Sequence, residues 1–243
     1  MSFPVFRVEW RVALRRRRLL AFNVGIPLLL VAPLALGGAP AYHASAAYAV
    51  LFVLFGTFGS AIPLLREADG GPLRRVVLSG FPEPRFVVER VLAGTALDFL
   101  QLLPAMAVVL GAGRAGATVW MAAAPAILLA LLTANVLGIW IAAVAASVAE
   151  GALLAAVVAL FLLHGSGVFR TPTPGGVGER IEAILPFRPL HEVFLAGSGG
   201  IGPGGAAEIL LGMLPAAAAP ILFLMASTGL SGRLLERISA TVQ

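Results

Sequence analysis

The chain has 243 residues, of which 59% are hydrophobic and 12% charged, and its mean hydropathy is +0.97. A soluble domain is about a quarter charged residues, so this composition excludes a soluble enzyme and indicates an integral membrane protein. Lysine and cysteine are both absent. The chain therefore has no P-loop lysine for ATP, no Schiff-base lysine and no disulfide. Its three scattered histidines lack metal-site spacing, and we expect no catalytic residue and no metal.

Residues 1–18 are predicted to form an amphipathic helix. Phe6 and Trp10 recur at helical spacing, and Arg7 and Arg11 lie on the opposite side. A helix with aromatic and arginine faces beside a span is typical of a segment that lies in the membrane interface. The alternative is a basic tail that only prevents translocation.

Six apolar runs follow, and each is close to the ~20 residues that a helix needs to cross the hydrocarbon core. We therefore expect an all-α integral membrane protein, with a transmembrane domain at 19–230 and a polar tail at 231–243. The fourth run is longer than a bilayer requires, which predicts a tilted or extended helix. The predicted spans are residues 19–36, 46–65, 88–111, 119–147, 152–169 and 209–230.

The fourth predicted span also carries a small residue at every fourth position. Small residues at this spacing let helix backbones approach closely, so we predict a close helix contact along this ridge. The ridge consists of Ala122, Ala126, Ala130, Ala134, Gly138, Ala142 and Ala146.

The arginines predict how the chain is oriented. Thirteen lie in residues 1–18, in 66–90 and in the tail, whereas four lie in the intervening connections. Arginine is retained on the cytoplasmic side, so both termini and a loop at 66–85 are expected in the cytosol. The membrane is expected to be the plasma membrane or a bacterial-type inner membrane. The loop at 170–207 is expected outside, with a short amphipathic helix over 177–185. This distribution explains the pI of 11.2 without a nucleic-acid partner.

The first predicted cytosolic loop contains a candidate docking helix. Gly70-Gly71-Pro72 interrupts the preceding span, and proline suits a first helical position. A short helix is then expected over 73–79, ended by Gly80 and Pro82. Such a helix offers a compact contact for a partner protein; the alternative is a basic loop that only anchors the topology.

Three segments resemble the membrane subunits of ATP-binding-cassette exporters of the second type, a six-helix permease family. Arg66-Glu67-Ala68-Asp69-Gly70, with the apolar stretch 73–79 after it, stands at the place of the family's acidic loop motif. Residues 185–194 resemble its proline-containing segment before the last span, although the asparagine is missing. Glu9-Trp10-Arg11 lies in the matching amino-terminal helix.

This resemblance implies a permease subunit that forms the translocation pathway as a dimer with an identical or homologous permease, surrounded by membrane lipids. It implies two copies of a separate ATPase subunit, which would hold the ATP and magnesium, and no cofactor in this chain. It also implies that the loop contacts the ATPase. The residues expected to make that contact are Glu67, Asp69, Leu73, Arg74, Arg75, Val77 and Leu78.

Two other interpretations remain open. The pattern Phe6-Arg7-Val8-Glu9-Trp10-Arg11-Val12-Ala13 also resembles the permease of the cytochrome c maturation system, which handles haem. An ATP-independent membrane carrier or scaffold belongs to a different class. Inverted repeats would favour a carrier, and none is evident.

Few polar residues lie inside the predicted spans. Thr95, Asp98 and Gln101 share one helix face, and Asn135 and His164 lie in later spans. An ionisable group in hydrocarbon is costly unless it is sheltered. These residues either line a pathway or form hydrogen bonds between helices. A pathway with so few charges predicts an amphipathic or lipid-like substrate.

Overall fold

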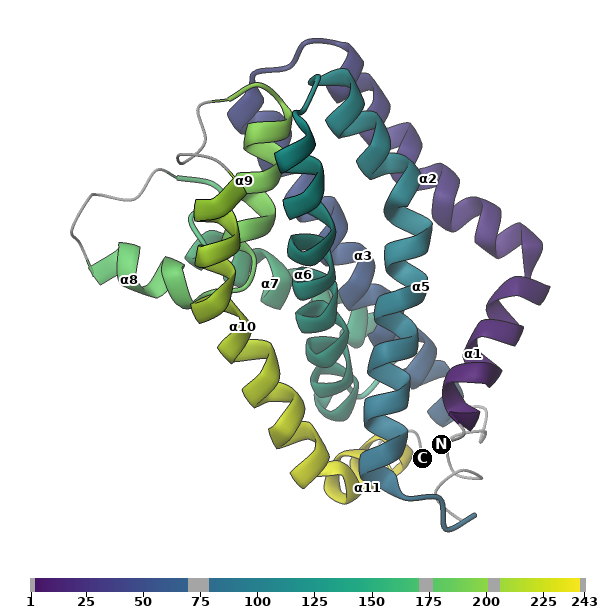
Figure 1. Cartoon of the computed structure of the whole chain (residues 1–243). Coiled ribbons are helices and arrows are strands. Elements are labelled where there is room, and N and C mark those ends of the chain that lie inside the picture. The colour runs from purple at the N-terminus through teal and green to yellow at the C-terminus, as the bar shows by residue number, and fades with distance from the viewer. Residues whose placement is uncertain (1–2, 70–78, 171–176, 201–205, 241–243) are drawn as a thin grey trace.

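A computed structural model describes residues 3–69, 79–170, 177–200 and 206–240. Throughout these residues the regular elements are α-helices, and six of them are long and apolar enough to cross a membrane (Figure 1). The chain is therefore an all-α integral membrane protein. The six long helices are α2 (Arg17–Leu36), α3 (Ala41–Asp69), α5 (Glu83–Ala112), α6 (Ala117–Val144), α7 (Val148–Gly165) and α10 (Ala206–Gly229).

Four shorter helices complete the described chain: α1 (Pro4–Arg15), α8 (Val177–Ile184), α9 (Arg188–Gly197) and α11 (Ser231–Ala240). Helices α1 and α11 lie at the same end of the bundle (Figure 1). There Leu235 of α11 packs in one core cluster with Phe86 and Val87 of α5.

Helix α6 is the central helix of the bundle, and its small-residue ridge contacts α3. A Cβ added to Gly138 would lie 2.6 Å from the Cβ of Ser60, and one added to Gly56 would lie 2.9 Å from the Cβ of Ala134. The predicted close approach is therefore present between these two helices. Ala146, the last member of the ridge, is exposed and lies beyond the end of α6.

The helices differ from the predicted spans at several ends. Arg16, with φ −87° and ψ 60°, separates α1 from α2, so the amphipathic helix ends before residue 18. Helices α3 and α5 begin at Ala41 and Glu83, before the apolar runs do. Hydropathy locates the hydrocarbon-spanning part, whereas backbone hydrogen bonding carries a helix on into its polar flank.

The break between α6 and α7 comes earlier than the sequence suggests. Ala145 is extended, and the Ser147 side chain accepts a 3.1 Å hydrogen bond from the Glu150 amide. A serine followed three residues later by glutamate is a helix-start signal. Glu150 and Gly151, which lie between the fourth and fifth predicted spans, therefore belong to the first turn of α7.

The outer segment at 170–207 contains α8, where an amphipathic helix was expected over 177–185, and also α9, which was not expected and is part of the core. Leu190, Val193 and Phe194 are fully buried. The Phe194 ring lies 4.9 Å from the Phe52 ring of α3, measured between centroids. The apolar spacing of these residues is that of a helix face, which the expectation of a loop overlooked.

Candidate functional site

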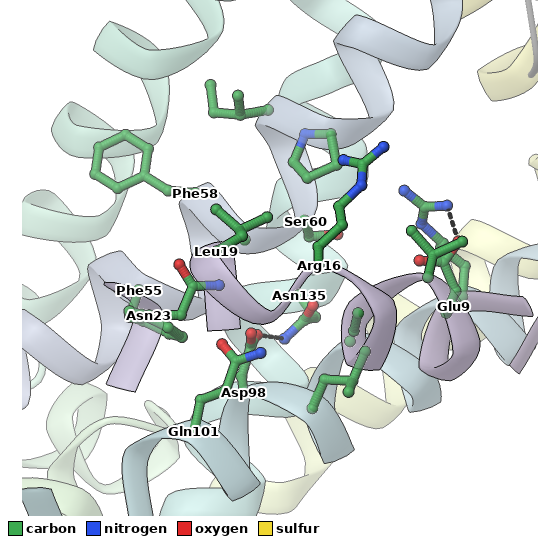
Figure 2. A pocket seen from close by; sticks show the side chains of 18 of the residues that line it. Glu9, Arg16, Leu19, Asn23, Phe55, Phe58, Ser60, Asp98, Gln101 and Asn135 are labelled. Atoms are coloured by element: carbon green, nitrogen blue, oxygen red, sulfur yellow. Dashed lines mark hydrogen bonds and ion pairs between the residues drawn. The ribbon is translucent and has the colours of Figure 1, made fainter. Parts of the chain in front are cut away.

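A cavity of about 720 Å³ lies between the amino-terminal helices α1 and α2 on one side and α3, α5 and α6 on the other. Apolar side chains form much of its wall, including Leu19 from α2 and Phe55 and Phe58 from α3 (Figure 2). Polar groups gather at its two ends. We call these the ionic end, which lies beside α1, and the inner end, which lies between α5 and α6.

The ionic end contains Arg90, which is 8% exposed and pairs with two glutamates. Its guanidinium donates to both carboxylate oxygens of Glu67, at 2.8 and 3.0 Å, and also to Glu9. A bidentate arginine–carboxylate contact fixes geometry as well as charge. Burial raises the pKa of Glu9, Arg90 lowers it, and the nearby Glu67 carboxylate raises it.

The neighbouring residue Glu89 holds the start of α1. Its carboxylate accepts hydrogen bonds from the backbone N–H groups of Val5 and Phe6, at 2.8 and 3.4 Å, and from Arg85 at 2.7 Å. The first N–H groups of a helix have no partner within the helix, and negative charge is favoured there. Glu89 and Arg90 thus fix α1 to α5.

The inner end contains a hydrogen-bonded pair of buried residues. The Asn135 side-chain amide donates to Asp98 at 2.9 Å and to the Leu131 carbonyl at 3.0 Å. Two glycines give the pair its space. A Cβ on Gly59 would lie 3.1 Å from an Asp98 carboxylate oxygen, and one on Gly94 would lie 2.3 Å from the Asn135 side-chain oxygen.

The other predicted polar residues are placed differently. Gln101 lies one turn from Asp98 and lines the same cavity (Figure 2). Thr95 is buried but does not line it, and both its hydroxyl and the Gln101 carbonyl oxygen have no hydrogen-bond partner in the described structure. His164 is exposed and stacks on Phe169 at the end of α7, so it does not join Asn135.

Comparison with known proteins decides the family. A model of the ABC-2 type transporter family matches residues 5–196, from α1 to the end of α9. The chain belongs to the ABC-2 type transporter family. The comparison with curated proteins gave no significant match. The chain is thus the multi-pass permease component of such a transporter. This component does not itself contain the ATPase site. Membership implies an ATPase partner and usually a second permease subunit.

The permease's predicted ATPase-contact residues lie in and beside the loop between α3 and α5. Leu73, Arg74, Arg75, Val77 and Leu78, and the side chain of Asp69, lie outside the described residues. Glu67 is described, and it pairs with Arg90 at the ionic end. Gly80 has φ 69°, a left-handed conformation that favours glycine.

Several residues of the candidate site were not singled out from the sequence. Glu89 and Arg90 are adjacent charges at the start of a long apolar helix, where charge is expensive, and this was an available signal. Gly94 carried a weaker signal, because glycine in a span often marks close contact between helices. In the described part of the permease, no cluster of three or more acidic or histidine side chains is suited to a metal ion.

Proposed function

We propose that this permease forms half of the pathway of an ATP-driven exporter. It would work as a dimer with an identical or homologous permease and with two ATPase subunits, which bind the ATP and magnesium. Family membership supports this arrangement. So does the lysine-free composition, because a chain without lysine cannot supply the P-loop lysine that contacts nucleotide phosphates.

The ionic end carries the proposal that ATP use is coupled through the loop at 66–85. Glu67 lies near the end of α3, where the loop begins, and Arg90 lies just after the loop, in α5. These two residues form an ion pair with each other, and Arg90 also forms an ion pair with Glu9 of α1. A force applied to the loop by an ATPase would therefore reach α1, α3 and α5 together and would act on the wall of the cavity.

The orientation is part of the proposal. Thirteen arginines on one side against four on the other favour cytosolic termini, and the placement of α1 and α11 at one end of the bundle is compatible with it. Cysteines introduced singly at Ser79 and Ser198 are expected to react with impermeant reagent from opposite sides of sealed cells. Reaction of both from outside would contradict this orientation.

The experiment that tests coupling is purification of the full-length tagged chain from its own membranes. An ATPase should co-purify, and Leu73→Asp or Leu78→Asp should release it or uncouple its hydrolysis from transport. Val177→Asp is the matched control, since Val177 is 74% exposed in α8, on the predicted outer side. Unchanged recovery together with unchanged coupled hydrolysis in both loop variants would overturn the proposal. Absence of any ATPase would favour the carrier interpretation.

A further inference from the structure

The inner end of the cavity presents hydrogen-bond acceptors without a matching cation. One Asp98 oxygen, Oδ2, accepts from Asn135, while Oδ1 accepts no hydrogen bond in the described structure. The Gln101 carbonyl oxygen is also buried and unpartnered. None of the ion pairs formed by the described residues involves Asp98.

This arrangement favours an occupant that brings positive charge and N–H donors. A buried carboxylate is expensive to desolvate unless a cation and hydrogen bonds compensate it, and a buried acceptor left unpaired costs free energy as well. Asn135 supplies one neutral donor to Asp98. A protonated amine would supply both the missing charge and donors for Asp98 Oδ1 and Gln101.

The rest of the cavity determines what such an amine would be attached to. Leu19, Phe55, Phe58 and Leu97 give the wall an apolar and partly aromatic character. Aromatic faces also tolerate an adjacent ammonium group. Toward the ionic end the lining includes Arg16 (Figure 2) and Arg66. For neither arginine does the described structure give an ion pair. They would repel a second positive charge.

We propose that this cavity binds an amphipathic amine with one positive charge. Its amino group would lie between Asp98 and Gln101, and its hydrocarbon part would lie along the apolar wall toward α1. This inference deepens the proposed function, on which it rests, by naming the substrate class of the permease. The arginines at the other end would select against polyamines.

The test is photo-crosslinking of the full-length chain in phosphatidylcholine nanodiscs. The probes are a tetradecylamine with a diazirine in its chain, and the alcohol and carboxylate of the same length. The amine is expected to label peptides within 55–67 and 90–101 about tenfold more than the alcohol does, since a charge-assisted hydrogen bond has roughly that effect on affinity. Asp98→Asn should remove most of this preference. Glu208→Gln, which removes an exposed carboxylate outside the cavity, should leave it unchanged.

Two further measurements keep the test decisive if Asp98→Asn is poorly inserted. Gln101→Leu retains the carboxylate and should weaken labelling by the amine several-fold. In the wild-type chain, unlabelled tetradecylamine should compete with the probe, whereas tetradecanol should not. Equal labelling by amine and alcohol, or competition by both, would overturn the inference. If an ATPase partner co-purifies but labelling is not selective for the amine, the proposed function stands and only this inference fails. If labelling is selective for the amine but no ATPase co-purifies, only the proposed function fails.

Discussion

The two ends of the cavity each contain a buried ionisable side chain, and they differ in how its charge is compensated. At the ionic end, the buried charge of Arg90 has two carboxylate partners, Glu67 and Glu9. At the inner end, the buried carboxylate of Asp98 has one amide partner, Asn135. A charge that is fully compensated within the chain serves to hold helices together. The partly uncompensated Asp98 carboxylate is the group that we propose binds a cation from outside the chain.

The largest expected effect comes from breaking the ionic end. Arg90→Met leaves Glu67 and Glu9 without their cation, and removing one partner of a buried ion pair costs roughly 3–5 kcal/mol. Because Glu9 and Glu67 are 25% and 32% exposed, we expect a loss of stability at the bottom of this range, about 3 kcal/mol. Unfolding in detergent, followed by circular dichroism, measures it. Arg114→Gln, an exposed turn residue, is the control; equal stability of the two variants would refute the structural role of the ionic end.

Crowding the inner end is expected to have a smaller effect. In Gly94→Ala the new Cβ would lie 2.3 Å from the Asn135 side-chain oxygen, and overpacking of this kind costs about 1–3 kcal/mol. Gly25→Ala is the matched control, because nothing lies within 4 Å of its added Cβ. The same unfolding measurement should show destabilisation in the first variant only. A Gly94→Ala protein as stable as Gly25→Ala would mean that the pair is not tightly packed.

Changing the Asp98 side chain separates structure from ligand binding. Asp98→Leu loses the hydrogen bond to Asn135, which costs about 0.6 kcal/mol on average inside membranes. Asp98→Asn can keep a hydrogen bond there, so stability and ATPase assembly should stay near wild type while transport or substrate preference changes. Transport assays normalised to folded protein distinguish the two. Normal transport by a stable Asp98→Asn protein would assign Asp98 to helix packing alone.

The smallest effect concerns the pH dependence of the ionic end. Because the pKa of Glu9 is raised above its ordinary value of 4.5, the folded chain retains a proton there that the unfolded chain has released. Stability from this group is therefore present at low pH and is lost as pH rises from about 4.5 through the raised pKa. Subtracting the pH profile of Glu9→Gln from that of the wild type should reveal this decline. A flat difference across that window would contradict it.

Hydropathy was sufficient to predict the six long helices, because the bilayer dictates their length and apolar composition. The sequence did not predict α9 as part of the core. Its apolar residues pack against Phe52, more than 100 positions earlier, and such partners cannot be found from local patterns. The early end of α6 follows from the Ser147 cap, a local signal that was present but outweighed by hydropathy.

The candidate site was predicted in part. The shared face of Asp98 and Gln101 follows from helical spacing, and Asn135 was correctly among the possible partners. The pairing of Arg90 with Glu9 could not be foreseen, since it depends on the fold of α1 back onto α5. His164 was grouped with the polar residues by chemistry alone, and the geometry of α7 places it elsewhere.

The hydrogen bonds from α1 to Glu89 have a consequence for how the chain is made. Val5 and Glu89 are 84 positions apart, so the amino-terminal helix is synthesised long before the carboxylate that caps it. Its first N–H groups must be satisfied by water or lipid headgroups until α5 has entered the membrane. Attachment of α1 to α5 can therefore occur only after the loop at 66–85 and Glu89 have been synthesised.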